Sequence, residues 1–147
     1  MKPADIYATY AEISKDLDAH WHNQGSAVFG GALSRLRTVA EAGCVEAASA
    51  LAEIFALPGP RYNPEEGYRW YFISYSIEES YSTEFQNERD DSHYLGRLDD
   101  FRNESMVNEL VDKLGLDRIR QLDIEVNAWL RDHKIFFTDP RDHRTKA

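Results

Sequence analysis

The chain of 147 residues has one cysteine and no long hydrophobic run. Cys44 alone excludes an internal disulfide and a cysteine-rich metal site, which fits a reducing compartment. The N-terminus, MKPAD, has no apolar stretch of signal-peptide length, and no window approaches the roughly 20 apolar residues that cross a bilayer. We therefore expect a cytoplasmic protein with no membrane partner. Cys44 has no activating base among its neighbours, so we expect it to fill core space.

Basic side chains are also scarce, with 17 Lys and Arg against 26 Asp and Glu, which gives a formal net charge of -9. Nucleic-acid binding needs a patch of Lys and Arg that displaces counterions from the phosphate backbone, so nucleic acid is not an expected partner. The acidic charge would attract a basic partner, although solubility alone also explains an acidic composition. Both interpretations stay open.

What the chain does have is enough apolar surface for one folded domain. Hydrophobic residues make up 42% of it, including 3 Trp, 8 Tyr and 7 Phe, which is too aromatic for a disordered chain. The length suits one domain and is too short for two. We expect a single domain over residues 1–137, followed by a frayed polar tail over 138–147.

Apolar residues recur at three- and four-residue spacing, which is typical of amphipathic helices. Ser26 can cap one helix, Gly43 can end it, and two prolines at positions 58 and 60 stop the next. No alternating pattern or Asn-Gly turn supports a sheet. The prediction is an all-α fold of about six helices, at residues 6–21, 26–43, 47–55, 64–77, 106–114 and 116–130. Residues 78–100 are either an extension of the fourth helix or a long loop.

The stretch NPEEGYRWYF, residues 63–72, opens the fourth helix with a capping asparagine, a proline and two glutamates. Gly67 and Ser74 lie seven residues apart with Trp70 between them, so they form a strip of small side chains. We expect this strip to let the preceding helix approach closely, with Ala48 and Ala52 as the matching flat surface.

The order of residues from position 42 to 74 resembles one unit of the SEL-one-like repeats, which are relatives of the tetratricopeptide repeats. The residues that carry the resemblance are Ala42, Gly43, Cys44, Val45, Glu46, Ala47 and Leu51, a Pro/Gly loop, and then Asn63, Gly67, Trp70, Tyr71 and Ser74. The match covers about 35 residues, the length of one helix-turn-helix repeat. The family usually has alanine at Gly67 and an alanine pair at Ser74-Tyr75, followed by another glycine-led repeat, which this chain lacks.

This resemblance implies a compact solenoid of α-α hairpins, with one clear repeat, that holds another protein rather than doing chemistry. No cofactor and no metal are expected. His20 and His22 are two residues apart, so on a helix they point in different directions. Adjacent carboxylates such as Asp90 and Asp91 leave a small hydrolase as a weaker hypothesis, and we do not expect an enzyme.

The most acidic stretch of the chain is the window 78–104, which carries nine acidic and three basic residues, a net charge of -6 out of -9. Aromatic residues interleave with these acids, as in protein-binding patches. The alternative is a solvated insertion whose aromatics fold back onto the core. The candidate protein-binding residues are Glu78, Glu79, Tyr81, Glu84, Phe85, Glu88, Asp90, Asp91 and Tyr94.

Size, charge and helical pattern together resemble the immunity proteins that bacteria make against secreted toxins. Many such toxins are basic and are blocked by a charge-complementary partner. The expected partner is therefore a basic toxin domain. The alternative is a regulatory adaptor that recruits a signalling or envelope-assembly protein.

Overall fold

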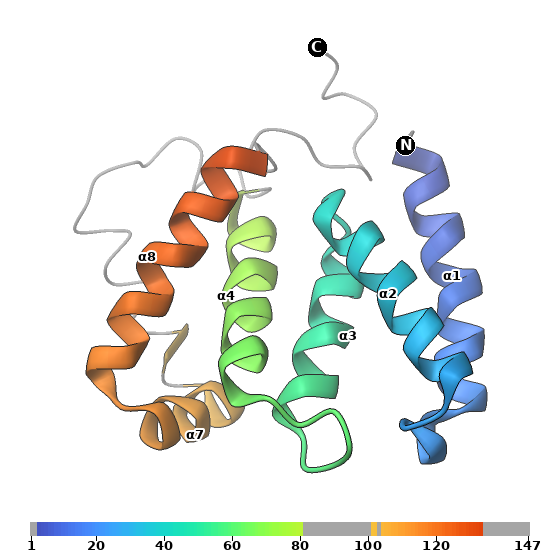
Figure 1. Ribbon diagram of the computed structural model, residues 1–147. Helices are drawn as coiled ribbons and strands as arrows, with labels where there is room; N and C mark the ends of the chain where they lie inside the picture. The colour runs from blue at the N-terminus through green and yellow to red at the C-terminus, as the bar shows by residue number, and fades with distance from the viewer. Residues whose placement is uncertain (1–2, 81–100, 103, 134–147) are drawn as a thin grey trace.

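The computed structural model describes residues 3–80, 101–102 and 104–133, and these residues contain six α-helices, one short 3-10 helix and no strand (Figure 1). The all-α prediction is confirmed. The elements are α1 (Pro3–Ala19), η1 (Trp21–Asn23), α2 (Ala27–Glu41), α3 (Val45–Ala56), α4 (Pro64–Ser80), α7 (Ser105–Leu114) and α8 (Leu116–His133). None of the helices in this described part is both long and apolar enough to cross a membrane.

The helix ends follow local signals in the sequence. The Ser26 hydroxyl accepts a hydrogen bond from the Phe29 amide at 3.1 Å and caps α2, and the Asn63 side chain accepts one from the Glu66 amide at 3.2 Å at the start of α4. The first helix ends at Ala19, earlier than the predicted Trp21. Trp21 instead opens η1, where its ring packs edge-on against Phe29 with centroids 6.2 Å apart.

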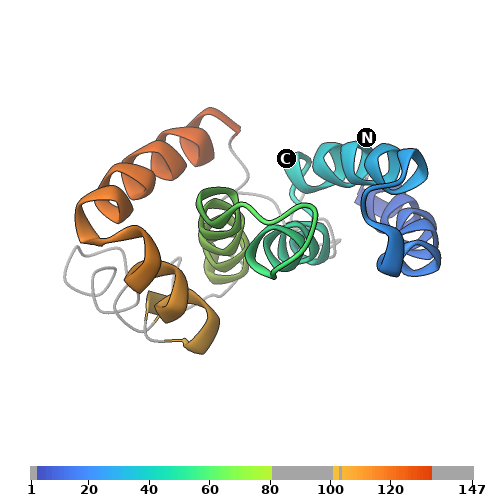
Figure 2. The ribbon, with the colours of Figure 1, turned by 60° about the horizontal axis from the view of Figure 1, so that its bottom comes forward.

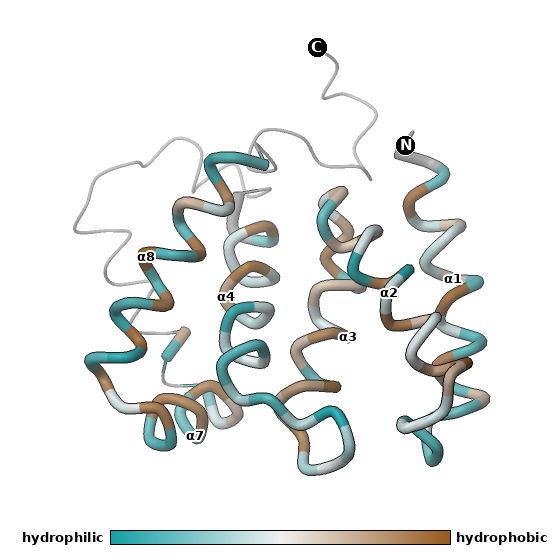
Figure 3. The backbone as a smooth tube through the Cα atoms, in the orientation of Figure 1, coloured by the Kyte–Doolittle hydropathy of each residue, from teal (hydrophilic) through white to brown (hydrophobic). Residues whose placement is uncertain are grey.

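Helix α3 forms the middle of the molecule, packed between α2 and α4. Figure 3 shows it as hydrophobic along most of its length, and eight of its twelve residues are buried. Helix α1 packs on α2, while α7 and α8 both pack on α4. Seen in Figure 2, α2 and α8 stand on the same side of the α3–α4 pair. The three helices α2, α4 and α8 therefore border a common surface, with α4 in the middle.

The α3–α4 contact depends on small side chains, as expected, but the matching residue is different. A Cβ on Gly67 would lie 3.0 Å from the Ala56 Cβ and 3.1 Å from the Ala56 Cα, so the nearest surface is Ala56 rather than Ala48 or Ala52. Seven residues further along α4, the Ser74 hydroxyl lies 2.6 Å from the Ser49 hydroxyl. The antiparallel register of the two helices sets these pairs, because Gly67 near the start of α4 meets the end of α3.

An aromatic cluster on α4 holds the short described segment 101–102. Phe101 is 2% exposed and packs on Tyr68, Phe72 and Tyr75, with centroids 6.0, 5.7 and 4.9 Å away. Its neighbour Arg102 forms an ion pair with Asp123 of α8. The segment is therefore fixed between α4 and α8.

One buried hydrogen bond continues this contact. The Tyr68 hydroxyl donates to the Asp123 carboxylate at 2.6 Å, so α4, α8 and the segment 101–102 meet at a single carboxylate. Burial raises the pKa of the Tyr68 hydroxyl well above its ordinary value, and the neighbouring Asp123 raises it further. The hydroxyl therefore stays protonated and remains a donor.

Candidate functional site

The predicted acidic binding segment falls almost wholly outside the described residues. Glu78 is exposed near the end of α4, and Glu79 belongs to the same helix, which continues to Ser80. The residues outside the described part are Tyr81, Glu84, Phe85, Glu88, Asp90, Asp91 and Tyr94. Residues 78–80 are helical as part of α4, and the question of helix or loop for the remainder falls outside the described residues. Residues 134–147, with the expected tail, also lie outside the described part.

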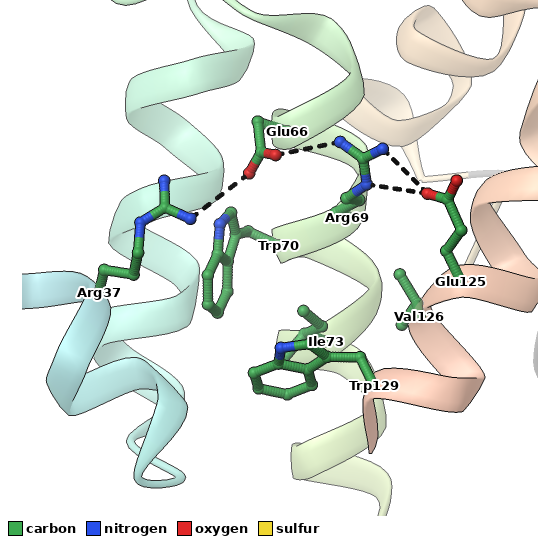
Figure 4. A pocket seen from close by; sticks show the side chains of 8 residues that line it. All are labelled: Arg37, Glu66, Arg69, Trp70, Ile73, Glu125, Val126 and Trp129. Atoms are coloured by element: carbon green, nitrogen blue, oxygen red, sulfur yellow. Dashed lines mark hydrogen bonds and ion pairs between the residues drawn. The ribbon is translucent and has the colours of Figure 1, made fainter. Parts of the chain in front are cut away.

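A groove lies among α2, α4 and α8 (Figure 4). We call it the double-tryptophan groove. It encloses about 190 Å³. The residues that line it are Arg37 from α2, Glu66, Arg69, Trp70 and Ile73 from α4, and Glu125, Val126 and Trp129 from α8.

Two tryptophans form the apolar part of the groove. The rings of Trp70 and Trp129 meet edge to face, with centroids 5.9 Å apart and planes at 75°. Trp70 is buried at 4% exposure, whereas Trp129 is half-buried and has surface left for another molecule. Ile73 and Val126 complete this surface and are themselves 4% and 2% exposed. Its burial makes Trp70 a core residue of the α4–α8 contact.

A chain of ion pairs crosses the groove from α2 to α8. Arg69 occupies the middle, since its guanidinium lies 3.0 Å from Glu66 and 2.9 Å from Glu125. The Glu66 carboxylate also faces Arg37 of α2, at 3.9 Å (Figure 4). The groove is therefore bounded on one side by charged groups that already neutralise each other.

Just beyond the groove, Arg118 of α8 holds Glu65 of α4 with two parallel hydrogen bonds of 2.7 and 2.9 Å. The hydrogen bond from Arg118 lowers the pKa of Glu65, so this carboxylate stays ionised under mildly acidic conditions. Arg118 also lies 3.9 Å from Glu125. The bidentate pair fixes the spacing between α4 and α8, and hence the width of the groove.

Arg37 is the least constrained charged group in the groove. Its side chain is 44% exposed, and its distance of 3.9 Å to Glu66 is too long for a hydrogen bond. Its guanidinium lies 5.9 Å from the ring centroids of both Phe55 and Trp70, which is the range of a weak cation-π contact. This side chain can move without breaking a short hydrogen bond.

One polar atom in the groove has no hydrogen-bond partner among the described residues. The indole Nε1 of Trp70 is buried and makes no hydrogen bond with any described residue. Figure 4 shows this nitrogen turned toward the side of the groove where Arg37 and Glu66 lie. Buried tryptophan N–H groups usually have an acceptor, so an unpaired one within a cavity requires an explanation.

The opposite end of the groove is marked by the last residue of α8. The His133 ring stacks on Trp129, with centroids 3.8 Å apart, and its Nε2 lies 3.8 Å from the carboxylate of Glu41, the last residue of α2. Helix α2 therefore contacts α4 through Arg37 and Glu66, and contacts α8 through Glu41 and His133.

A second cavity, of about 350 Å³, lies between the turn after α3 and helix α7. The Lys113 ammonium sits over the Tyr62 ring at 4.9 Å on its border. Among its lining residues no buried polar atom is left without a partner. We therefore take the double-tryptophan groove as the candidate site.

The described residues bear on two kinds of chemical site, a metal site and a reactive thiol. They include no group of three or more His, Cys, Asp and Glu side chains placed to hold a metal ion. Cys44 is completely buried, and burial raises the pKa of its thiol to about 11, so almost none of it is the nucleophilic thiolate near neutral pH. The groove presents a surface of aromatic and charged groups.

The sequence argument did not find this groove. Glu65, Glu66 and Arg69 have the spacing of helical ion pairs, which is a visible signal, but their partners on α2 and α8 are distant in the chain. Arg37, Glu125 and Trp129 come together only after α2 and α8 take their places beside α4. Nothing in the sequence pairs the tryptophans at positions 70 and 129, whose rings meet only in the fold.

Comparisons of the chain with protein-family models, with curated proteins and with solved structures found no match. The resemblance to SEL-one-like repeats therefore stays a prediction based on the residues from Ala42 to Ser74.

Proposed function

We propose that this protein is a binding module, without catalytic activity, that holds a partner protein in the double-tryptophan groove. The observation that carries the proposal is the paired Trp70 and Trp129 between charged groups of three helices. Tryptophan and arginine are the residues that most often dominate binding energy at protein interfaces. The expected solenoid of helical hairpins belongs to the same proposal, because such folds bind proteins along a concave face.

The rigidity of the groove supports this role. Ion pairs through Arg69 and Arg118 join α4 to α8, so the two tryptophans keep their spacing before a partner arrives. A preformed site loses less conformational entropy on binding than one that must be ordered. Trp129 is only partly buried and the Arg37 side chain is 44% exposed, which leaves surface for contact.

We further propose that the partner is a basic bacterial toxin domain, which the protein neutralises by direct binding as an immunity protein. Support comes from the net charge of -9, of which -6 falls in the window 78–104. Opposite charges speed the encounter of two proteins and favour the correct partner over others. In this proposal the acidic window attracts the toxin and the groove anchors it.

The alternative is a regulatory adaptor that uses the same groove. An immunity protein binds one partner tightly, whereas an adaptor binds several with modest affinity. Dissociation constants measured for all proteins recovered with this chain distinguish the two. If the chain is a hydrolase instead, changing both Asp90 and Asp91 to asparagine should abolish turnover and leave partner binding unchanged.

The test uses the product of a neighbouring gene, chosen as a candidate cationic toxin domain, with two matched variants. Trp129→Ala removes a half-buried tryptophan in the groove, and Trp21→Ala removes a half-buried tryptophan outside it that has a similar edge-on aromatic partner. We expect Trp129→Ala to weaken the complex by about thirtyfold or more, as for an interface hot spot, and Trp21→Ala to change it little. Failure of the wild-type protein to bind the toxin domain or protect cells from it would reject the immunity role.

A further inference from the structure

We propose that the double-tryptophan groove accepts an uncharged, extended stretch of a partner polypeptide. One backbone carbonyl accepts a hydrogen bond from the Trp70 indole, and an apolar side chain packs on Ile73, Val126 and Trp129. This inference rests on the proposed binding role and names the chemistry that the groove recognises.

The hydrogen-bond donor is the first part of the argument. Trp70 is 96% buried, lines the groove and has an N–H group without a partner among the described residues. A buried unpaired donor destabilises the unbound protein relative to one that is paired. A ligand that brings an oxygen acceptor to this point therefore gains affinity that the same ligand without the acceptor lacks. A peptide offers such an oxygen at every residue.

The paired charges around the groove favour a neutral acceptor over a charged one. The groove and its border hold three arginines and three glutamates, and each of them belongs to at least one ion pair. They are Arg37, Arg69 and Arg118, and Glu65, Glu66 and Glu125. An added carboxylate or ammonium group would be desolvated here without an unpaired counter-charge among these residues. A backbone carbonyl avoids this cost.

The shape of the groove favours one apolar side chain beside that carbonyl. Ile73, Val126 and the half-buried Trp129 form the apolar part of its lining. At about 190 Å³ the groove is smaller than the roughly 300 to 1,000 Å³ of pockets for drug-sized ligands, so it suits one residue of a peptide rather than a folded element.

Arg37 is the side chain that the peptide displaces. Its guanidinium lies 5.9 Å from the centre of the Trp70 ring, on the side of the groove toward which the indole nitrogen turns (Figure 4). Because its ion pair with Glu66 spans 3.9 Å, moving it aside breaks no hydrogen bond. Displacement of Arg37 gives the carbonyl access to the buried N–H group.

Three blocked tripeptides test the inference, each with alanine at both ends and leucine, lysine or glutamate in the middle. The readout is the indole N–H signals of Trp21, Trp70 and Trp129 in nuclear magnetic resonance spectra of the full chain. We expect the leucine peptide to shift the Trp70 signal saturably, with a Kd about tenfold lower than those of the charged peptides, and to leave Trp21 unmoved. Equal Kd values for the three peptides, or an unmoved Trp70 signal, would overturn the inference.

Two variants test the Trp70 N–H donor and the displaced Arg37 side chain one at a time. Trp70→Phe keeps an aromatic ring without the N–H group, and we expect it to raise the Kd for the leucine peptide about three- to tenfold, followed through the backbone signals of Ile73 and Val126. Arg37→Ala is expected to lower that Kd, because no side chain has to be displaced. An unchanged Kd in Trp70→Phe, or a raised Kd in Arg37→Ala, would count against the inference.

This inference and the proposed function can fail separately. A toxin domain that binds the wild-type chain about thirtyfold or more tightly than Trp129→Ala, while no tripeptide moves the Trp70 signal, overturns the peptide site but supports the groove as the binding surface. Saturable binding of the leucine peptide supports the site even if the toxin domain is not the partner.

Discussion

At the scale of single residues, Gly67 shows most clearly how the contact between two helices constrains a sequence. In an exposed helix, changing glycine to alanine stabilises by about 1 kcal/mol. At position 67 the new Cβ would lie 3.0 to 3.1 Å from three atoms of Ala56, two of them in the backbone of α3. The backbone of a buried helix cannot move aside cheaply, so the steric cost exceeds the gain in helix propensity.

Gly67→Ala is therefore expected to lower the free energy of unfolding, by about 1 kcal/mol after both effects. The matched control is Gly31→Ala in α2, where nothing lies within 4 Å of the new Cβ, and which should raise stability by about 0.5 to 1 kcal/mol. Urea denaturation of the two variants measures the difference. A more stable Gly67→Ala variant would show that α3 and α4 are not packed this closely.

Cys44 provides a second residue-scale prediction. Its thiol is completely buried and burial raises its pKa from 9.0 to about 11. Between these two values the unfolded thiol ionises and the folded one does not, so the stability that this group contributes is lost as the pH rises from about 9 to about 11. The Cys44→Ala variant should lose less stability than the wild type over that range. Denaturation curves at a series of alkaline pH values would show this.

At the scale of helices, the Arg118–Glu65 pair joins the start of α4 to the start of α8. The hydrogen bond from Arg118 lowers the pKa of Glu65 below its ordinary 4.5, so the folded state favours the ionised carboxylate. The stability that this pair contributes is present above about pH 4.5 and is lost as the pH falls through the lower, folded-state pKa.

Glu65→Gln should consequently be less sensitive to acid than the wild type. Urea denaturation between neutral pH and about pH 3 measures the slope of stability against pH for both proteins. Glu109→Gln on α7 is a suitable control, because Glu109 is exposed and no ion pair involves it within the described residues. Identical slopes for Glu65→Gln and the wild type would mean that the pair does not form in solution.

The contact among α4, α8 and the segment 101–102 depends on the Tyr68 hydroxyl. Tyr68→Phe keeps the buried ring but removes a hydrogen bond to a carboxylate, which is expected to cost about 1.5 to 3 kcal/mol. Tyr71→Phe removes a half-buried hydroxyl that makes no hydrogen bond with the described residues, so it should change stability little. Similar unfolding free energies for the two variants would argue against the Tyr68–Asp123 bond.

The helices themselves could be predicted from sequence because their signals are local. The spacing of apolar residues, the caps at Ser26 and Asn63, and the glycine stops at Gly43 and Gly115 all act within a few residues. The partner of Gly67 could not be predicted in the same way. Whether Ala48, Ala52 or Ala56 faces it depends on the register between two helices, which no short-range pattern specifies.

At the scale of the whole molecule, the candidate site arises from distant segments. Arg37, Trp70 and Trp129 belong to three helices, and only the placement of α2 and α8 on one side of the α3–α4 pair brings them together. The segment 101–102 illustrates the same limit, because Phe101 and Arg102 follow an acidic stretch in sequence yet contact the core. Charge patterning indicates solvent exposure on average and does not identify such anchors.

The most direct measurement is selection of binding peptides from a random library on the immobilised wild-type protein, with affinities then determined for the wild type, Trp129→Ala and Trp21→Ala. If the double-tryptophan groove is the binding surface, selected peptides carry a central apolar residue and lose about thirtyfold or more of their affinity for Trp129→Ala, but little for Trp21→Ala. Selected peptides that bind Trp129→Ala as tightly as the wild type would contradict a binding role for this groove.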